Sequence, residues 1–384
     1  MNNLQELIDR EFPVITNTIY LNHAGVGPWP RRTAEAVSHF ATECAQTGAQ
    51  AYPRWMALET GLRGRLKAFI NAPSVSDIAI LKNTSEGLSV VAHGFPWKRG
   101  DNVVSGNEEF PSNRIVWQSL APQGVKLRQV DLQSNGDPEA ALLAACDSRT
   151  RLLAVSSVEY ATGLRLDLLR LGAECRKRGI AFCVDAIQGL GVFPHDVQAM
   201  GIDFLAADAH KWLLAPEGTA VFYCAPAWRE RLILRQFGWH MVEEVGNFDR
   251  TDWTPANSAR RFECGSPNML GIHALAASLS LFEEIGVETI EQRVLDRSRD
   301  LMDRIRAIRA LRLVTPHAAG RFAGIVTFRI DSIAPDEAYR ALTESGVICA
   351  ARAGGIRFSP HFFTPLDQLD RALHIVNTFT QLNK

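Results

Sequence analysis

Between residues 75 and 225, short apolar runs alternate with segments of helical periodicity. Runs of about four consecutive apolar residues are typical of strands that are buried on both faces of a sheet. Helix-length segments separate several of these runs, and the one at 168–178 ends at Gly179, a common helix C-cap. The pattern therefore predicts an α/β fold with a mainly parallel sheet covered by helices on both faces. The predicted strands are 78–81, 102–105, 152–155, 181–184, 204–206 and 220–223.

The pattern changes after about residue 260, where longer helical stretches surround fewer strands. This part predicts a smaller α+β domain, with helices at 269–285, 295–310, 336–345 and 366–382 and strands at 324–328 and 347–348. We expect a large α/β domain over residues 16–258 and a small C-terminal domain over 259–384. Residues 1–15 are expected to pack with the small domain.

Composition excludes several classes of protein. The 41 Lys and Arg residues nearly balance the 42 Asp and Glu residues, so no bulk positive field is available to hold nucleic acid or an anionic membrane. The seven cysteines are scattered without a CxxC pair, which favours reduced thiols over disulfides or a metal site. No stretch approaches the roughly 18 apolar residues of a membrane span. We expect a soluble, cytoplasmic protein without a metal, nucleic-acid or membrane partner.

Candidate chemistry lies directly after the predicted strands, where open α/β sheets bind their ligands. Thr84 and Ser85 follow the first strand and open a helix, which makes an anion cradle or simply an N-cap. Asp185 follows the strand 181–184, where many acids only cap a helix. Lys211 lies between two core strands, where an ammonium is costly to bury unless it has a partner or a chemical task such as Schiff-base formation. A surface turn is the plainer explanation for this lysine.

The combination is more specific than its parts. An electron-sink cofactor such as pyridoxal 5′-phosphate (PLP) needs a lysine, an acid for its pyridine nitrogen and a phosphate cradle. All three are present at successive strand ends, as Thr84-Ser85, Asp185 and Lys211. The sequence therefore indicates a PLP enzyme.

Two segments carry a family resemblance that extends from about Tyr20 to His361. Residues 208–218, Asp-Ala-His-Lys-Trp-Leu-Leu-Ala-Pro-Glu-Gly, and residues 184–189, Val-Asp-Ala-Ile-Gln-Gly, resemble the lysine and acid motifs of the class V aminotransferases. This family of fold-type I PLP enzymes includes cysteine desulfurases, kynureninases and isopenicillin N epimerase-like proteins. The resemblance implies a fold-type I architecture with PLP as cofactor.

The resemblance also implies roles for individual residues. Lys211 would hold PLP and later shuttle the substrate's α-proton, Asp185 would keep the pyridine nitrogen protonated, and Gln188 would contact the ring hydroxyl. Phosphate would be bound by Thr84, Ser85 and His210. The family commonly has Ser or Thr where this chain has Asp208, and because two anions repel, we expect Asp208 to hold His210 or water instead.

Other implied contacts involve the substrate and a second subunit. Arg357 resembles the arginine that grips the α-carboxylate of an amino acid, a task that suits its planar fork, and Arg352 is a candidate for a second contact. A surface position on an edge strand is the alternative for Arg357. Ser266 resembles a residue that reaches the partner's cofactor phosphate across a homodimer with shared active sites. A simple Ser-Pro turn is the alternative for Ser266.

Departures from the desulfurase pattern bear on the reaction. Phe110 stands where desulfurases place a histidine on the ring; it can stack there but cannot transfer protons. Only four residues separate Arg352 from Arg357, without the long loop that carries the desulfurase cysteine, and Cys349 is expected to be a packed thiol. His23 is a candidate acid or base, or a structural hydrogen-bonding residue.

These observations favour a PLP enzyme acting on an amino acid as a lyase or epimerase, without net amino transfer. A true aminotransferase that releases a keto acid is the alternative. A cysteine desulfurase, or a catalytically silent protein with this fold, is less favoured.

Overall fold

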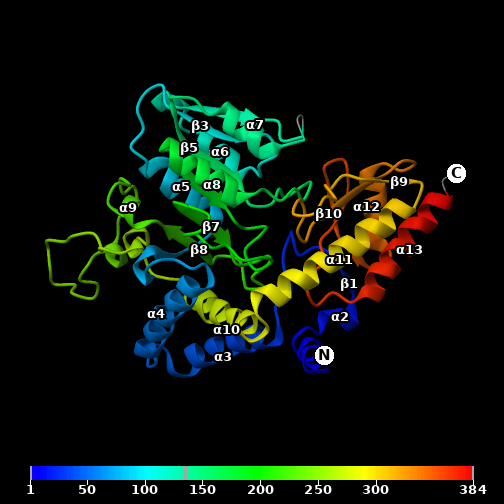
Figure 1. Ribbon diagram of the computed structural model, residues 1–384. Coiled ribbons are helices and arrows are strands. Elements are labelled where there is room, and N and C mark those ends of the chain that lie inside the picture. Colours follow the sequence, from blue (N-terminus) through cyan, green and yellow to red (C-terminus); the bar gives the residue numbers. More distant parts are fainter. Residues whose placement is uncertain (1, 134–135, 383–384) are drawn as a thin grey trace.

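The computed structural model describes residues 2–133 and 136–382 and contains a large sheet, a smaller sheet and the helices around them (Figure 1). The helices of the first part are α1 (Asn2–Glu11), α2 (Val14–Asn17), α3 (Arg31–Thr47), α4 (Tyr52–Phe69), α5 (Thr84–Gly94), α6 (Ser112–Gln118), α7 (Pro138–Ala145), α8 (Leu168–Arg178) and α9 (Pro226–Arg229). Those of the second part are α10 (Met269–Ile285), α11 (Val287–Ala307), α12 (Pro335–Glu344) and α13 (Leu366–Leu382).

The large sheet has seven strands in the order β2-β8-β7-β6-β5-β3-β4. All neighbours are parallel except β8, which runs antiparallel to both β2 and β7. The carboxyl ends of the other six strands therefore meet at one edge, which is where a parallel sheet presents its ligands. The strands are β2 (Ile78–Leu81), β3 (Asn102–Gly106), β4 (Lys126–Val130), β5 (Thr150–Ser156), β6 (Ala181–Asp185), β7 (Phe204–Asp208) and β8 (Ala220–Cys224).

Both faces of this sheet are buried, because successive side chains of a strand point to opposite faces. In β5, Leu153 and Val155 join one apolar cluster, which includes residues of α4, α8 and α10. Leu152 and Ala154 join the other, which includes residues of α5 and α6. The continuous apolar runs of the sequence reflect this double burial, and the predicted fold class is confirmed.

The second part of the chain forms an antiparallel sheet of order β12-β13-β10-β9, which packs with α11, α12 and α13 into a third apolar cluster. Its strands are β9 (Leu311–Leu313), β10 (Val326–Ile330), β12 (Ala350–Arg352) and β13 (Gly355–Phe358), and a parallel pair joins β1 (Ile19–Tyr20) to β11 (Val347–Ile348). Near the N-terminus, Phe12 stacks on Phe363 with a ring separation of 3.6 Å, and Glu11 pairs with Arg32 of α3.

Several details differ from the pattern-based expectation, and strands β1, β9, β12 and β13 were not predicted. The helix expected at 295–310 begins at Val287, directly after Gly286, and leaves helical geometry at Ile308 to allow β9 to form. The strand expected at 324–328 lies two residues later. Strand β4 was not predicted, because its sequence Lys-Leu-Arg-Gln-Val is largely polar, as suits the edge of a sheet.

Among the described residues, no single helix is long and apolar enough to cross a membrane. Helices α10 and α11 meet the criteria of length and composition only as a pair bent by 84°. Most of α10 is buried inside the protein, which accounts for its apolar sequence.

Candidate active site

A cavity of about 250 Å³ lies at the carboxyl edge of the large sheet and against the hairpin β12–β13. Residues that follow β2, β3, β5, β6 and β7 converge on it, together with the loop after β1. Nine of the sequence-predicted site residues line this cavity: Thr84, Phe110, Asp185, Gln188, Asp208, His210, Lys211, Arg352 and Arg357. The topology therefore unites residues that are more than 270 positions apart.

Lys211 and Asp185 are the central pair of ionisable groups. Both are buried, with exposed fractions of 8% and 2%. Desolvation, together with the nearby Arg357 and Arg352, lowers the pKa of Lys211 to about 8 against the opposing effect of Asp185 and Asp208. Desolvation raises the pKa of Asp185 to about 6, while the Ile187 N–H, which donates to Oδ1, favours the carboxylate. A substantial fraction of Lys211 is thus a neutral amine near neutral pH, the form that Schiff-base chemistry requires.

Two hydrogen bonds join the N-terminus of α5 to the end of β7. The Asp208 N–H donates to Thr84 Oγ1 at 2.9 Å, and the Thr84 N–H donates to Asp208 Oδ2 at 3.2 Å. The other carboxylate oxygen, Oδ1, lies 3.6 Å from His210 Nδ1, and neither atom has a hydrogen-bond partner among the described residues. Asp208 thus lies beside His210, as a residue that orients this histidine would have to.

Gln188 is fixed at both ends of its amide. Its Oε1 accepts from Trp212 Nε1 at 2.8 Å, and its Nε2 donates to the Ala24 carbonyl at 3.1 Å. The backbone of Lys211 packs tightly against Gly27. A Cβ on Gly27 would lie 2.1 Å from the Lys211 carbonyl oxygen. Only glycine fits at that position without displacing the backbone that presents the lysine.

Arg357 is positioned on β13 with an exposed fraction of 2%. Its Nη1 donates to the Tyr160 carbonyl at 2.7 Å and its Nη2 to Asn22 Oδ1 at 3.2 Å, while Nε is buried without a partner. Burial lowers the pKa of Arg357 to about 10, so the group remains charged at neutral pH. Arg352 is more exposed and donates to the carbonyl of its own neighbour Ala351.

Two aromatic rings line the cavity on the side of β3 and β5. Phe110 and Tyr160 meet edge to face, with ring centroids 5.1 Å apart. Lys211 Nζ lies 5.5 Å from the centroid of the Phe110 ring. Phe110 is partly exposed toward the cavity, which leaves its face available for stacking on a planar ligand.

Three predicted residues do not line the cavity. His23 is fully buried, its Nδ1 lies 2.7 Å from the Ser359 carbonyl, and desolvation lowers its pKa to about 4. Ser85 donates to Ser112 Oγ at the start of α6. Ser266 accepts a 3.4 Å hydrogen bond from Trp239 Nε1, away from the cavity.

Sequence reasoning left out some residues that shape the site. Ser112 lines the cavity, and its position at the start of a helix, like that of Ser85, was the available signal. Asn22 supports Arg357, although it comes from the other end of the chain. Nothing in the local sequence relates Asn22 to Arg357, since long-range pairing such as the parallel bridge between Asn22 and Ser359 brings the two segments together.

No cysteine lines this cavity, and all seven cysteines belong to the described part of the chain. Cys349 is the one adjacent to the arginine hairpin; its exposed fraction is 4%, and burial raises the pKa of its thiol to about 12. A thiol in this environment is a poor nucleophile, because the thiolate is the reactive form.

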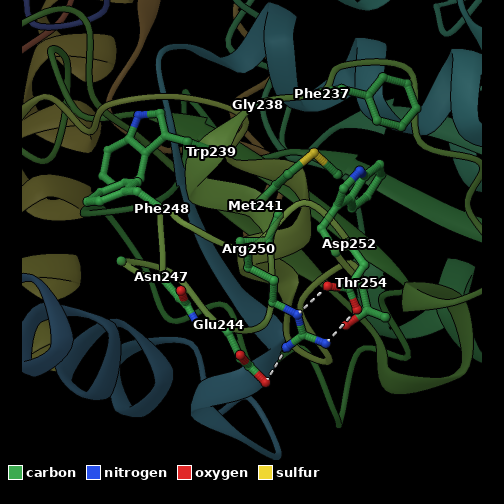
Figure 2. Close-up of a pocket in the computed structure, with 13 residues that line it drawn as sticks. Phe237, Gly238, Trp239, Met241, Glu244, Asn247, Phe248, Arg250, Asp252 and Thr254 are labelled. Carbon is green, nitrogen blue, oxygen red and sulfur yellow. Dashed lines mark hydrogen bonds and ion pairs between the residues drawn. The ribbon is translucent and has the colours of Figure 1, made fainter.

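A second cavity, of about 450 Å³, lies within the loop that follows α9 and projects from the protein at the left of Figure 1. Phe237, Trp239 and Phe248 are among its lining residues (Figure 2). Arg250 is held between Glu244 and Asp252 in the same loop. The loop exposes several large apolar side chains, and Phe248 is the most exposed of them, at 77%. It also adjoins the segment of Ser266 through the contact with Trp239.

Comparisons with known proteins agree with the motifs. The family model for class V aminotransferases matches residues 19–366. A probable cysteine desulfurase from Methanothermobacter thermautotrophicus is 30% identical over 350 residues, covering 90% of this chain and 86% of that protein. A cysteine desulfurase from Klebsiella pneumoniae is 29% identical, covering 85% and 82%. The solved structure of a cysteine desulfurase from Thermococcus onnurineus has a TM-score of 0.88 at 24% identity, over 98% of each chain, which shows a shared fold.

The residues of the first cavity fit PLP. The buried Lys211 could form a Schiff base with the aldehyde of PLP, and the buried Asp185 could hold a proton on its ring nitrogen. The unpartnered Nδ1 of His210 and the hydroxyl of Thr84 lie at the helix N-terminus, where phosphate binds in many proteins. The unpartnered Nε of Arg357 remains for a carboxylate.

Proposed function

This chain belongs to the class V aminotransferases, a family of PLP-dependent enzymes, and we propose that it is a lyase that removes a sulfur group from the β-carbon of a small amino acid. The observation that carries the proposal is the composition of the cavity: it gathers Lys211, Asp185 and the two arginines but no cysteine. The relatives named cysteine desulfurases support chemistry at a carbon–sulfur bond. The absence of a thiol in the cavity argues against the persulfide that a desulfurase forms on its own cysteine.

The protein's first task is to orient the substrate. Arg357 presents a planar fork to the α-carboxylate, and Arg352 lies on the same hairpin, next to its turn. Fixing one end of the amino acid aligns its Cα–H bond with Lys211. PLP, when bound, supplies an electron sink for the charge that develops at Cα. Asp185 maintains this capacity by holding a proton on the pyridine nitrogen.

Lys211 then moves the proton. Its Nζ takes the proton from Cα, the electron pair left behind forms a Cα–Cβ double bond, and the Cβ–S bond breaks with its electrons going to sulfur. The sulfur leaves as a thiolate, or as sulfide from cysteine itself. The 2-aminoacrylate that is released hydrolyses in water to pyruvate and ammonia. No protein thiol and no external electron donor is needed.

Product analysis tests this assignment. Incubation of the PLP-loaded enzyme with L-cysteine should release pyruvate, ammonia and sulfide in equal amounts. The Cys349→Ser variant, which removes the thiol nearest the arginine hairpin, should give the same products at the same rate. Alanine with protein-bound persulfide, lost in that variant, would instead identify a desulfurase. A stable pyridoxamine absorbance band with mercaptopyruvate would identify an aminotransferase.

The proposal includes a homodimer. The loop after α9 exposes Trp239, Phe248 and Trp253, more apolar surface than an isolated loop normally carries, and Trp239 contacts Ser266. Complementation tests whether the sites are shared. Mixed dimers of a Lys211→Ala subunit and a Ser266→Tyr subunit should regain activity, because one site then combines an intact lysine with an intact serine. Two inactive variants that stay inactive after subunit exchange would contradict shared sites.

A further inference from the structure

Two buried acids lie behind the cavity, and the proposed reaction uses neither. Glu109 follows β3 and Glu159 follows β5, with exposed fractions of 4% and 0%. Each directly precedes an aromatic residue of the cavity, Phe110 or Tyr160, and these two rings are in contact. The acids are thus close to the site but separated from it by its aromatic wall.

Their hydrogen bonding is very different. Glu109 accepts three hydrogen bonds: from the Ser156 N–H at 2.7 Å, from Ser156 Oγ at 2.5 Å and from Asn113 Nδ2 at 2.8 Å. Asn113 is itself fixed by Trp117 Nε1 at 2.9 Å. Both carboxyl oxygens of Glu159 are buried without a hydrogen-bond partner among the described residues. Donors stabilise an ionised carboxylate, whereas burial without donors disfavours it.

The charges around Glu159 act in the same direction. The ionisable groups that influence it are Glu109, Glu108 and Asp185, all of which are acids. Burial and these neighbours raise the pKa of Glu159 well above its ordinary value, while burial opposed by its donors raises that of Glu109 to about 7. When two carboxyl groups influence each other and their surroundings differ in this way, one stays protonated while the other ionises.

We propose that Glu159 is a neutral carboxylic acid and that Glu109 carries the single buried negative charge of the pair, which acts on Asp185, the residue that would bind the cofactor's ring nitrogen. The link to Asp185 is short. Ser156, which Glu109 binds twice, is the cross-strand neighbour of Asp185, and the Ser157 N–H donates to the Asp185 carbonyl at 2.9 Å.

This arrangement makes Glu109 a positioning residue. Its charge, which is present above about pH 7, would favour protonation of the cofactor's ring nitrogen, which Asp185 contacts in the proposed function on which this inference rests. A second charge on Glu159 would add a carboxylate to Glu109 and Asp185, and Asp185 already has the acid Asp208 among its ionisable neighbours. Keeping Glu159 protonated avoids that repulsion and lets the turn that carries Tyr160 remain packed.

Infrared spectroscopy of the PLP-loaded enzyme tests the protonation of Glu159 directly. The difference spectrum between the wild type and Glu159→Gln at neutral pH should contain the C=O stretching band of one buried carboxylic acid. The amide is nearly isosteric and also neutral, so this variant should fold and keep its PLP. A difference spectrum with carboxylate bands only would overturn the proposal.

The pH dependence of the cofactor's visible absorbance tests the charge of Glu109. Glu109→Gln should lower the midpoint of this titration by about 1 pH unit, because a nearby negative charge that favours the protonated cofactor is lost. Glu159→Gln should leave the midpoint unchanged. An equal shift in both variants would show that Glu159 is ionised, and no shift in Glu109→Gln would show a purely structural role. Neither readout uses the substrate, so both are independent of the product analysis above.

Discussion

Replacing Arg357 by lysine tests whether the planar guanidinium group, and not its positive charge alone, is needed to bind the substrate. Arg357 is buried, its Nη1 and Nη2 bind Tyr160 and Asn22, and its Nε is buried without a partner. Lysine would keep a cation at this position but would lose the paired N–H groups that match a carboxylate. We expect substrate affinity to fall while PLP binding is retained.

The size of the effect follows from the contacts. A hydrogen bond to a charged group contributes about 1.5–3 kcal/mol, and the shorter, non-planar ammonium would lose roughly one such bond to the substrate. At about 1.4 kcal/mol per factor of ten, the dissociation constant of the amino acid should rise roughly 10- to 150-fold. The Tyr160 carbonyl would also lose its donor, which places the outcome toward the upper end of that range.

The assay is a titration of the cofactor absorbance with amino acid, with PLP content measured in parallel. Arg352→Lys is the matched control, since Arg352 lies on the same hairpin but is exposed and binds only a neighbouring carbonyl; it should weaken binding less than tenfold. Unchanged substrate affinity in Arg357→Lys would refute carboxylate binding by this residue. Loss of PLP together with substrate would show that Arg357 is structural.

Three further predictions concern the lysine and its support. Lys211→Ala should bind PLP without fixing it, so borohydride reduction followed by denaturation should release all of the cofactor. The rate of PLP uptake by the apoenzyme should rise with pH and level off above about 8, because uptake requires the neutral amine and the pKa of Lys211 is lowered to that value; an ordinary lysine would still gain near 10.4. Gly27→Ala should lower the free energy of unfolding in urea by about 1–3 kcal/mol, because its Cβ would meet the Lys211 carbonyl, whereas Gly61→Ala in α4, where space is open, should raise it by about 0.5–1 kcal/mol.

The large sheet could be predicted from the sequence because its strands are buried on both faces. Six of its seven strands appear as apolar runs that need no knowledge of their neighbours. The edge strand β4 has no such run because its residues are half exposed, unlike those of β2 at the other edge, which are all buried. The start of α11 was also missed, since Gly286 separates two helices so closely that the periodicity does not show which one ends there.

The same distinction between local pattern and long-range packing applies to the residues of the site. Residues that directly follow a strand, such as Asp185 and Lys211, could be found from sequence because the sheet topology alone brings strand ends together. Contacts made by long-range packing could not. The pairing of Asn22 with Arg357, and the burial of Glu159 beside Glu109, depend on loops whose relative position has no local signal.

The geometry of one hairpin connects the fold to the proposed reaction. Strands β12 and β13 are joined by Ala353 and Gly354, both with positive φ angles of 50° and 67°, as in the tight two-residue turns of antiparallel hairpins. Such a turn holds Arg352 opposite Gly355 and leaves no chain to carry a thiol over the cavity. A substrate sulfur that leaves Cβ would therefore meet no cysteine among the described residues that line the cavity. The tight turn next to Arg352 thus supports the proposed release of the sulfur into solution over its capture as a persulfide.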